Sequence, residues 1–578
     1  MPDVVARVMA IRGITLETAA DFLEPTLRAL LPDPFQLKDM DAAVSRMITA
    51  IKYNEKICVF GDYDVDGATS SALLIRFCRA IGVLISYYIP DRMKEGYGPN
   101  SAAMQQLAAD GIKLVITVDC GVTAHEPLKA AKEAGLDVIV LDHHAGEPQL
   151  PPAAAVVNPN RIDETSQHRH MAAVGVTFLF LVALNNKLRE AGFYKKNVHS
   201  GLEPESSSIK EGGSPLSRGC ASSFMEPNLM SELDIVALGT VCDVVSLTGV
   251  NRAFVRQGLR VMSRSNNIGI NALLNVARNK GAADTYTAGF VLGPRVNAGG
   301  RVGKSDLGTR LLSTQDANEA HDIAQQLEKL NEERRMIEAQ TLEQALAMVS
   351  HTSTHAAFVD GEGWHPGVIG LVASRVKDRF NLPAFATAFD GEMGKGSCRS
   401  IKGIDIGAMI IAARQEGLLI NGGGHAMAAG YTVAKQAYLA FKEFIETRLA
   451  KVLAETPLEP TLLLDGLLTL GGVNVELAEK LQALAPFGSG NPEPRFAIMD
   501  VKLLRADIVG ANHLRLVFNS EIGGSLSAIA FRAMDNEIGQ ALANLKKGSR
   551  VNVAGYIRLN SYAMRNDVQL VVEDVAII

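Results

Sequence analysis

Three aspartates at alternate positions are the residues best suited to chemistry in this sequence: Asp62, Asp64 and Asp66. An apolar run at 57–60, typical of a buried strand, precedes them, and an apolar run at 72–75, typical of a helix, follows. We therefore expect the aspartates at the carboxyl edge of a parallel sheet, where open α/β folds keep their active sites. Clustered carboxylates repel one another unless cations lie between them, and their oxygens suit hard divalent ions such as Mg²⁺ or Mn²⁺. An acidic turn that caps a helix would account for one of the three.

Three later segments repeat this arrangement of an apolar run followed by residues of a metal-binding type. One apolar strand pattern ends at Asp119, and another ends at the sequence DHH, residues 142–144. A third apolar run, IVALGTVC, leads into Asp243. Each site alone is more typical of a buried aspartate or a hydrogen-bonded histidine, but four in order are hard to explain as core packing. They favour a two-metal site for phosphoryl transfer, in which one ion lowers the pKa of a water and the other stabilises the leaving oxygen.

Length and composition restrict the class of protein. The 578 residues are enough for about three or four domains, and 47% of them are apolar. The six cysteines are scattered without a C-x-x-C pair, which predicts a reducing compartment, no zinc site and no disulfide framework. We expect a cytoplasmic protein, because no signal peptide is visible and the longest apolar stretch, 171–184, is too short to span a membrane. This stretch is predicted to be a buried helix.

The net charge of −6 is a mild argument against nucleic-acid binding, where a basic surface is usual. It does not exclude such binding, because bound cations cancel the negative charge of a carboxylate site. A protein that holds one nucleic-acid strand also needs only a local basic groove. Net charge therefore bears on solubility more than on what a site does.

The four acidic motifs resemble a known superfamily. The sequences DYDVDG, VDCG, DHH and GTVCDVV are similar to the four motifs of the DHH phosphoesterases. Later segments narrow the resemblance to the RecJ family of bacterial, single-strand-specific 5′→3′ exonucleases. These segments are GPRVNAGGR at 293–301, HPGVIG at 365–370, GSCRS at 396–400, GGGHAMAAG at 422–430 and PFGSGNPEP at 486–494. The DHH motif alone specifies only the superfamily, whereas the combination is specific to the exonucleases.

The order of the predicted elements, together with the resemblance, implies an α/β protein. We expect a mostly parallel-sheet DHH domain and a second α/β domain, joined by a long helix at 314–350, and then a small β-barrel of the oligonucleotide-binding (OB) type. An insertion at 199–228, rich in Ser, Gly and Pro, is expected to be a mobile surface loop rather than a lid. The expected domains are an N-terminal helical segment at 1–50, the DHH metal-binding domain at 51–265, a connecting segment with the long helix at 266–354, the DHH-associated domain at 355–455 and the OB-like domain at 456–578.

For the catalytic centre, the resemblance implies two divalent ions, Mn²⁺ or Mg²⁺. The implied protein ligands are Asp62, Asp64, Asp66, Asp119, His143 and Asp243. Asp119 is expected to be the bridging carboxylate. His144 is expected to contact the scissile phosphate or to position a ligand, and Asp142 to orient the histidines next to it. The division of roles among the first three aspartates stays open, as does the choice between the two metals.

A second group of residues is expected to bind the phosphates of DNA. Glycines allow the backbone to approach an anion, and Ser and Arg supply hydrogen-bond donors. The resemblance implies that the segment 391–400 grips the 5′-terminal phosphate, although by itself such a segment is more typical of a Gly-rich hairpin. Arg295, Asn297 and Arg301 lie in a Gly-rich segment and are expected to neutralise charge in the transition state. The expected contacts to the 5′ phosphate and the DNA are Arg92, for which a surface position fits equally well, and Ser397, Arg399, Ser400, Gly423, Gly424 and His425.

These features favour a metal-dependent exonuclease that degrades a 5′-phosphorylated single strand to mononucleotides, in DNA repair and recombination. Two alternatives stay open: a DHH phosphodiesterase for cyclic dinucleotides or short oligonucleotides, and a scaffold that binds single strands without cleaving them. The first class usually lacks the third β domain, and the second loses the metal ligands that this sequence retains. By resemblance, the expected partners are single-stranded DNA, a single-strand-binding protein and a RecQ-type helicase. The chain is expected to be a monomer without membrane association.

Overall fold

The computed structural model describes residues 3–194, 224–264, 267–279, 281–349, 355–455, 461–521, 523–560 and 567–578. Most of the insertion at 199–228 lies outside these residues, so its assignment as a surface loop stays a prediction. The described chain divides into two compact units. The first unit contains Pro25–Met336 and Gly488–Asn491, and the second contains Met1–Glu24, Ile337–Phe487 and Pro492–Ile578.

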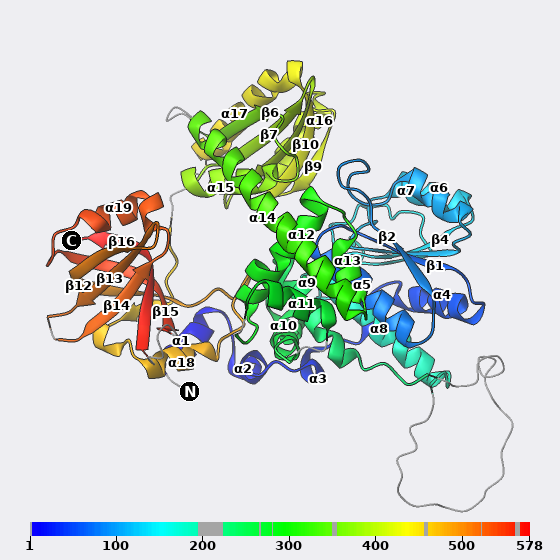
Figure 1. Ribbon diagram of the computed structural model, residues 1–578, viewed down its shortest axis with the longest axis horizontal. Coiled ribbons are helices and arrows are strands. Elements are labelled where there is room, and N and C mark those ends of the chain that lie inside the picture. Colours follow the sequence, from blue (N-terminus) through cyan, green and yellow to red (C-terminus); the bar gives the residue numbers. More distant parts are fainter. Residues whose placement is uncertain are drawn as a thin grey trace, which may run out of the picture. The chain divides into compact units, whose positions relative to one another are not determined.

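The first unit contains a five-stranded, entirely parallel sheet in the order β2-β1-β3-β4-β5 (Figure 1). Its strands are β1 (Ile57–Gly61), β2 (Ile85–Tyr88), β3 (Leu114–Val118), β4 (Asp137–Leu141) and β5 (Ala155–Val157). Every residue of β1 and β3 is buried, as is typical of parallel sheets with helices on both faces. Side chains alternate between the faces, because Ile57 and Val59 belong to one hydrophobic core and Cys58 and Phe60 to another.

Helices cover both faces of this sheet (Figure 1). One face carries α4 (Met40–Lys52), α5 (Val65–Ala80) and α8 (Ala173–Glu190), and the other carries α6 (Ser101–Ala109) and α7 (His125–Glu133). Helix α8 confirms the buried helix predicted from the apolar stretch at 171–184, since every residue from Ala173 to Leu181 is buried. The other described elements of this unit are α3 (Leu27–Leu30), η1 (Pro34–Gln36), η3 (Leu229–Glu232), α9 (Leu233–Cys242), α10 (Gly249–Met262), α11 (Ile268–Val276), η4 (Thr287–Leu292), α12 (Gly293–Val302) and α13 (Leu307–Ser313).

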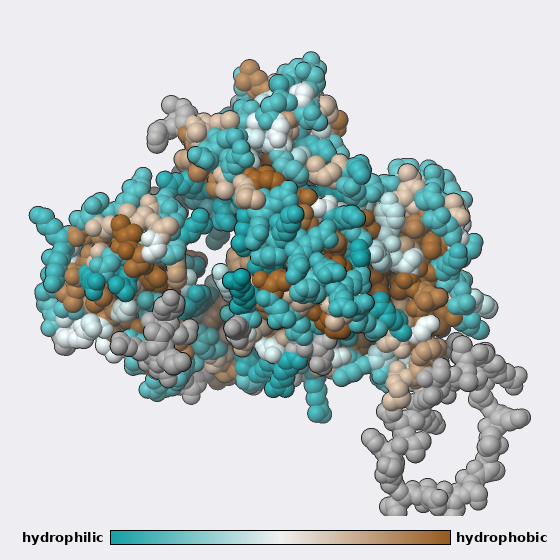
Figure 2. All heavy atoms as spheres, viewed as in Figure 1, coloured by the Kyte–Doolittle hydropathy of each residue, from teal (hydrophilic) through white to brown (hydrophobic). Residues whose placement is uncertain are grey.

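One long helix, α14 (Ala317–Met348), begins in the first unit and ends in the second. It confirms the long helix predicted at 314–350. Its sequence is rich in Glu, Gln, Leu, Ala and Arg, which favour helix formation at exposed positions. Figure 2 shows that hydrophilic side chains dominate the visible surface over this helix. Among the described helices of the chain, none is long and apolar enough to cross a membrane.

The second unit contains a smaller α/β sheet in the order β6-β7-β8-β10-β9. Its strands are β6 (Ala357–Glu362), β7 (Ala384–Asp390), β8 (Met393–Arg399), β9 (Asn421–His425) and β10 (Ala428–Ala434). Strands β6 and β7 pair in parallel, and the other pairs are antiparallel. Three helices pack against the sheet: α15 (Ile369–Phe380), α16 (Ile406–Gln415) and α17 (Tyr438–Glu455).

A β-barrel forms the C-terminal part of the second unit. Its strands are β12 (Arg495–Val509), β13 (His513–Asn519), β14 (Ser525–Ala530), β15 (Arg550–Asn560) and β16 (Asp567–Ile577), and the short β11 (Gly466–Leu468) pairs with β12. Pairing of β12 with β15 closes the barrel and so removes its open edges. Helices α18 (Val475–Gln482) and α19 (Glu537–Asn544), with the short turns η5 (Lys435–Ala437), η6 (Leu470–Gly472) and η7 (Ala533–Asp535), complete the unit. The two α/β sheets, the long helix and the barrel confirm the predicted fold class.

The N-terminal helices are divided between the two units. Helices α1 (Asp3–Ile11) and α2 (Leu16–Leu23) belong to the unit with the barrel, where Val8 shares a hydrophobic core with Leu477. Helix α4 instead contributes to the core beneath the first sheet. The helical segment predicted at 1–50 therefore serves two separate cores, because its apolar faces pack against different parts of the chain.

Candidate metal centre

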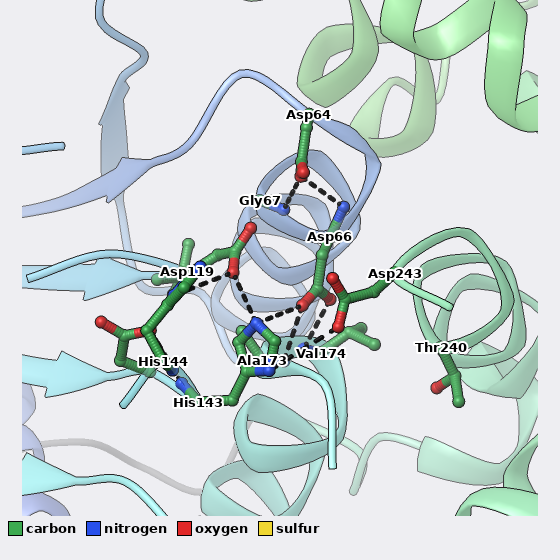
Figure 3. Close-up of polar contacts among 12 residues, drawn as sticks. Asp64, Asp66, Gly67, Asp119, His143, His144, Ala173, Val174, Thr240 and Asp243 are labelled. Atoms are coloured by element: carbon green, nitrogen blue, oxygen red, sulfur yellow. Dashed lines mark hydrogen bonds and ion pairs between the residues drawn. The ribbon is translucent and has the colours of Figure 1, made fainter. Parts of the chain in front are cut away.

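The carboxyl ends of three neighbouring strands bring the predicted metal ligands together. Asp62 follows β1, Asp119 follows β3 and Asp142 follows β4. These strands are adjacent and parallel, so the residues that follow them meet at one edge of the sheet. Asp243 reaches the same place from the end of α9, with Oδ2 at 3.6 Å from Nδ1 of His143. Figure 3 shows carboxylates from three separate segments pointing toward His143.

Asp64 and Asp66 are held by backbone amides, each at the start of a helix. Asp64 is the N-cap of α5, and its Oδ1 accepts hydrogen bonds from the amides of Asp66 (2.8 Å) and Gly67 (3.1 Å). The buried carboxylate of Asp66 accepts hydrogen bonds from the amides of Ala173 (2.7 Å) and Val174 (2.9 Å), at the start of α8 (Figure 3). The capping role that the sequence allows for one aspartate is therefore found at Asp64, while the positive end of α8 stabilises the charge of Asp66.

Asp119 adopts a left-handed backbone conformation, with φ of 60°. This conformation is uncommon outside glycine, although Asp and Asn tolerate it best, and strained residues of this kind cluster at functional sites. Asp119 is only 2% exposed, and its Oδ1 lies 3.3 Å from Nε2 of His143. The turn after β3 thus directs this carboxylate into the group of ligands and away from solvent.

The candidate ligands form three overlapping groups, and within each group the ligand atoms lie within 4.8 Å of one another. The groups are Asp62 with Asp64 and Asp119, Asp66 with His143 and Asp243, and Asp119 with His143 and His144. Asp119 and His143 each belong to two groups. Shared ligands of this kind are expected where two ions lie close together.

The donor atoms present fit divalent cations. Oδ1 of Asp62, Oδ1 of Asp119 and Oδ2 of Asp243 are buried, and none accepts a hydrogen bond from the part of the chain that the structure describes. A buried carboxylate oxygen without a donor is costly, whereas a hard cation satisfies it directly. The residues at this edge of the sheet therefore suit Mn²⁺ or Mg²⁺ bound by oxygen atoms and one or two imidazoles.

Repulsion among the carboxylates supports the same conclusion. Burial raises the pKa of Asp62 and of Asp119 well above the usual value, and neighbouring carboxylates raise it further. Burial, followed by the charges of neighbouring aspartates, raises the pKa of Asp66 to about 7 and that of Asp243 to about 9. The negative charges destabilise the metal-free folded state, and a bound divalent cation would remove this repulsion.

Asp142 holds both histidines. Its carboxylate accepts hydrogen bonds from the amides of Val122 (3.0 Å), His143 (2.7 Å) and His144 (3.1 Å), and from Nδ1 of His144 (2.8 Å). Burial raises the pKa of Asp142, but the hydrogen bond and charge of His144 outweigh it and bring the pKa to about 2. Burial likewise lowers the pKa of His144, but Asp142 outweighs it and brings that pKa to about 9. In the metal-free protein these interactions favour the imidazolium form of His144, which is suited to donate a hydrogen bond to a phosphate.

We expect Asp142→Asn to change the protonation of His144. Loss of the carboxylate charge removes the main interaction that raises the pKa of His144, so this pKa should fall from about 9 toward 6.5. An NMR titration of labelled histidine in the metal-free protein measures the change. Cleavage of DNA should fall about 10–100-fold, as is usual when a residue that orients a metal-binding histidine is removed. An unchanged pKa would mean that other carboxylates hold the proton on His144.

Three residues of the site were not predicted from the sequence. The hydroxyl of Tyr97 donates a hydrogen bond to the backbone carbonyl of Asp119 (2.8 Å). Asn158 and Asn160 donate to the backbone carbonyls of the two histidines. The asparagines follow β5 in the sequence VVNPN, so the pattern of an apolar strand with polar residues at its end was present there too. Tyr97 lies in a loop and carries no comparable signal.

Helix α12, which carries the predicted charge-neutralising residues, packs against the aspartate turn. A Cβ at Gly300 would lie 2.9 Å from the carbonyl oxygen of Tyr63, which is part of that turn. Burial raises the pKa of Tyr63, and the positive charges of Arg92 and Arg301 oppose this effect. The guanidinium of Arg92 lies over the Tyr63 ring, 5.1 Å from its centroid. The structure therefore brings Arg92 and α12, with half-buried Asn297 and Arg301, next to the candidate metal ligands.

Arg295 makes different contacts from those expected of a phosphate ligand. It is buried, and its guanidinium forms an ion pair with Glu328 of α14. It also donates a hydrogen bond to the carbonyl of Val291 (2.6 Å). A role in neutralising the transition state would require Arg295 to exchange this ion pair for the substrate, so that role stays a prediction.

In the second unit, β8 carries the predicted ligands of the 5′ phosphate. Arg399 donates a hydrogen bond to Oγ of Ser397 (3.1 Å), and a Cβ at Gly370 would lie 3.0 Å from the Arg399 guanidinium. Both side chains therefore lie beside the first turn of α15, where backbone amides favour anions. Ser400 is different, because it is buried and its hydroxyl donates to the carbonyl of Ile404 (2.7 Å). This geometry favours a structural role for Ser400.

The glycines and histidine predicted to face DNA lie on β9, at the edge of the second sheet. Strand β10 pairs with β9 on one side and with β8 on the other, which fixes their register. Gly423 and Ser397 both pair with Gly430, and His425 and Arg399 both pair with Ala428. Strands separated by one neighbour lie about 10 Å apart, so these residues, with Gly424, occupy one end of a single sheet.

Comparison with known proteins identifies the family. Three family models match the chain: the DHH family N-terminal domain at 56–201, the DHHA1 domain at 351–451 and the RecJ OB domain at 464–574. The single-stranded-DNA-specific exonuclease RecJ of Salmonella typhimurium is 33% identical over 100% of this chain and 96% of its own length. The protein of the same name from Bacillus subtilis is 32% identical over 99% of this chain and 68% of its own.

A solved structure agrees with the sequence comparison. The crystal structure of RecJ from Thermus thermophilus in complex with Mn²⁺ superposes with a TM-score of 0.79 at 28% identity, and covers 99% of this chain and 76% of the other. The matches extend over both units, from the parallel sheet with its carboxylates to the C-terminal barrel. Because full-length relatives share about a third of their residues with it, the chain belongs to the RecJ family.

Proposed function

We propose that this chain is a metal-dependent exonuclease that removes mononucleotides from single-stranded DNA in the 5′→3′ direction. The observation that carries the proposal is the group of buried carboxylates and His143 at the edge of the first sheet, with carboxylate oxygens that accept no hydrogen bond from the described residues. Curated relatives are named single-stranded-DNA-specific exonucleases, and one solved relative contains Mn²⁺. Hydrolysis of a phosphodiester is the reaction that suits such a ligand set.

Two bound Mn²⁺ or Mg²⁺ ions would supply a nucleophilic water and stabilise the leaving oxygen. We assign one ion to Asp62, Asp64 and Asp119, and the other to Asp66, His143 and Asp243. Asp119, which belongs to two of the candidate ligand groups, would contribute to binding of both ions, and His144 would donate a hydrogen bond to the scissile phosphate. Water attacks the first internucleotide phosphorus, the P–O3′ bond breaks, and the departing 3′ oxygen takes a proton. The released nucleotide keeps its 5′ phosphate, and the shortened strand gains a new one.

The direction of digestion would follow from binding of the terminal phosphate by Ser397, Arg399 and the first turn of α15. We expect Arg399→Ala to reduce the preference for a 5′-phosphorylated end. A hydrogen bond to a charged group contributes about 1.5–3 kcal/mol, so kcat/KM for the phosphorylated strand should fall about tenfold or more. The value for a strand with a 5′ hydroxyl should change little. Arg379→Ala, an exposed position at the other end of α15, is the matched control; equal losses on both substrates would contradict the assignment.

The proposed activity is tested by digestion of a 5′-phosphorylated, 3′-labelled single-stranded oligonucleotide with Mn²⁺ present. Progressive shortening from the 5′ end, absent with a matched hairpin and after chelation of the metal, is the expected result. A cyclic dinucleotide serves as the competing substrate. Cleavage of the cyclic dinucleotide with an intact oligonucleotide would favour the DHH phosphodiesterase class. Binding of the oligonucleotide without any cleavage would instead favour a scaffold.

The C-terminal barrel supports the exonuclease over the phosphodiesterase, because the latter class usually lacks a third domain. The barrel matches the RecJ OB domain model at 464–574. Association with a single-strand-binding protein and with a RecQ-type helicase, the monomeric state and the cytoplasmic location stay predictions, as do the limits of the five domains. Analytical ultracentrifugation and pull-down with each partner test the assembly, and limited proteolysis tests the domain limits.

A further inference from the structure

The loop between α9 and α10 carries the candidate ligand Asp243 in a strained backbone. Asp243 is the C-cap residue that follows α9, and Val244 comes next with φ of 59°. A β-branched residue in the left-handed region is a conformational outlier, because its side chain crowds the backbone there. Val244 is 68% exposed, so burial of its own side chain does not compensate for this strain. The conformation of the loop therefore depends on contacts made by the residues that follow.

One of these contacts comes from α10. The buried side chain of Asn251 donates hydrogen bonds to the carbonyl of Ser246 (3.0 Å) and to the carbonyl of His170 (2.6 Å). Asn251 thus ties the middle of the loop to the segment before α8. This contact therefore comes from α10, the helix that directly follows the loop in the sequence.

The second contact comes from a turn more than two hundred residues later in the chain. Gly488–Asn491 belongs to the compact unit of the metal centre, while the residues on either side of the turn belong to the other unit. The amides and carbonyls of Gly488 and Asn491 bond to each other (2.9 and 3.1 Å), which closes the turn. The carbonyl of Ser489 accepts a hydrogen bond from the amide of Leu247 (2.8 Å), whose side chain is buried.

The fit between this turn and the loop leaves no space for a side chain at Gly490. Gly490 has φ of 70°, and a Cβ there would overlap Oγ of Ser246 and lie 3.0 Å from its Cβ. A Cβ at Gly488 would lie 2.7 Å from Cδ1 of Leu247. The turn therefore contacts the two residues, Ser246 and Leu247, that follow the strained part of the Asp243 loop.

We propose that the Gly488–Asn491 turn is a positioning element that holds Asp243 in place for metal binding. The inference rests on the proposed function, because it takes Asp243 as a metal ligand. The turn lies between α18 and β12, so the segment that leads into the first long strand of the barrel also supports the loop of Asp243. Gly490 and Ser489 act through the loop and do not contact the metal themselves.

The test is the affinity of the full-length protein for Mn²⁺, measured without DNA by electron paramagnetic resonance. In Gly490→Ala the new Cβ should displace Ser246 and weaken Mn²⁺ binding about tenfold or more, the usual effect of losing support around a metal ligand. The double variant with Ser246→Gly removes the overlapping atoms and should recover most of the affinity. In an Asp243→Asn background, Gly490→Ala should weaken binding no further, because the positioned ligand is already lost.

Gly135→Ala is the matched control for backbone strain. Gly135 lies in the same unit at the end of α7, with φ of 74°, and a Cβ there would meet no heavy atom of the described residues within 4 Å. It should lose stability but keep its Mn²⁺ affinity. If Gly490→Ala does not fold, Gly488→Ala gives the milder overlap with Leu247 and should weaken Mn²⁺ binding in the same direction.

The outcomes separate this inference from the proposed function. Folded Gly490→Ala with unchanged Mn²⁺ affinity, beside a weakened Asp243→Asn, would overturn the positioning role and leave the metal centre intact. Unchanged Mn²⁺ affinity in Asp243→Asn would overturn the metal assignment itself. Failure of Ser246→Gly to restore binding would mean that Gly490→Ala acts elsewhere in the protein, and would also overturn the inference.

Discussion

Asp119→Asn should reduce DNA cleavage at least about a thousandfold, since metal ions contribute several kcal/mol to phosphoryl transfer and each 1.36 kcal/mol is a tenfold change in rate. Asp119 belongs to two of the three candidate ligand groups, so its loss affects more of the centre than loss of a ligand in one group. Asparagine has nearly the same shape and tolerates the φ of 60° at this position. The backbone of the site is therefore expected to stay as it is.

The same substitution should not destabilise the metal-free protein. Asp119 is buried among carboxylates that raise its pKa, so a neutral side chain removes repulsion from the folded state. With EDTA present, the Tm of Asp119→Asn should equal or exceed that of the wild type, while added Mn²⁺ should stabilise the wild type more. Single-turnover cleavage and thermal unfolding measure the two effects. Asp39→Asn, at another left-handed aspartate (φ 61°), is the control for backbone effects; cleavage retained by Asp119→Asn would exclude the bridging role.

The stability of the metal-free protein should fall as the pH rises, through the carboxylates of the metal centre. The folded-state pKa is about 7 for Asp66 and about 9 for Asp243, whereas an aspartate in an unfolded chain titrates near about 3.9. Between pH about 4 and about 9 the folded state therefore binds more protons than the unfolded state. The free energy of unfolding then decreases with rising pH, by the linkage between proton binding and folding. Below pH about 4 these carboxylates are protonated in both the folded and the unfolded state, and they no longer make stability depend on pH.

Asp243→Asn isolates one part of this effect, because asparagine does not titrate. With EDTA present, the Tm of the variant should rise relative to that of the wild type as the pH increases from 5 to 9. Each kcal/mol of difference in the free energy of unfolding corresponds to about 2–4 °C. Saturating Mn²⁺ should reverse the order, since the wild type binds the ion and the variant binds it weakly. Asp110→Asn, at an exposed carboxylate after α6, is the control and should show no such trend. A pH-independent difference between Asp243→Asn and the wild type would contradict the proposed repulsion.

The sequence by itself predicted the order of the folded parts and the clustering of most of the candidate metal ligands. Alternation of apolar strands and helices predicted the parallel sheet, and the switch to short strands predicted the barrel. Asp62, Asp119 and Asp142 each follow an apolar strand, and parallel neighbouring strands necessarily end at the same edge of a sheet. This is why residues far apart in the chain could be placed together before the structure was known.

The tertiary structure decided what depends on contacts between distant segments. Only the structure distinguishes Asp64, which caps α5, from Asp66, whose charge is held by the first amides of α8. It also places Arg295 in an ion pair with Glu328 and Ser489 against the loop that carries Asp243. Local sequence sets which residues lie at the end of a strand or helix. Which other segment then packs there follows from the burial of apolar surface across the whole unit, and no local pattern contains that information.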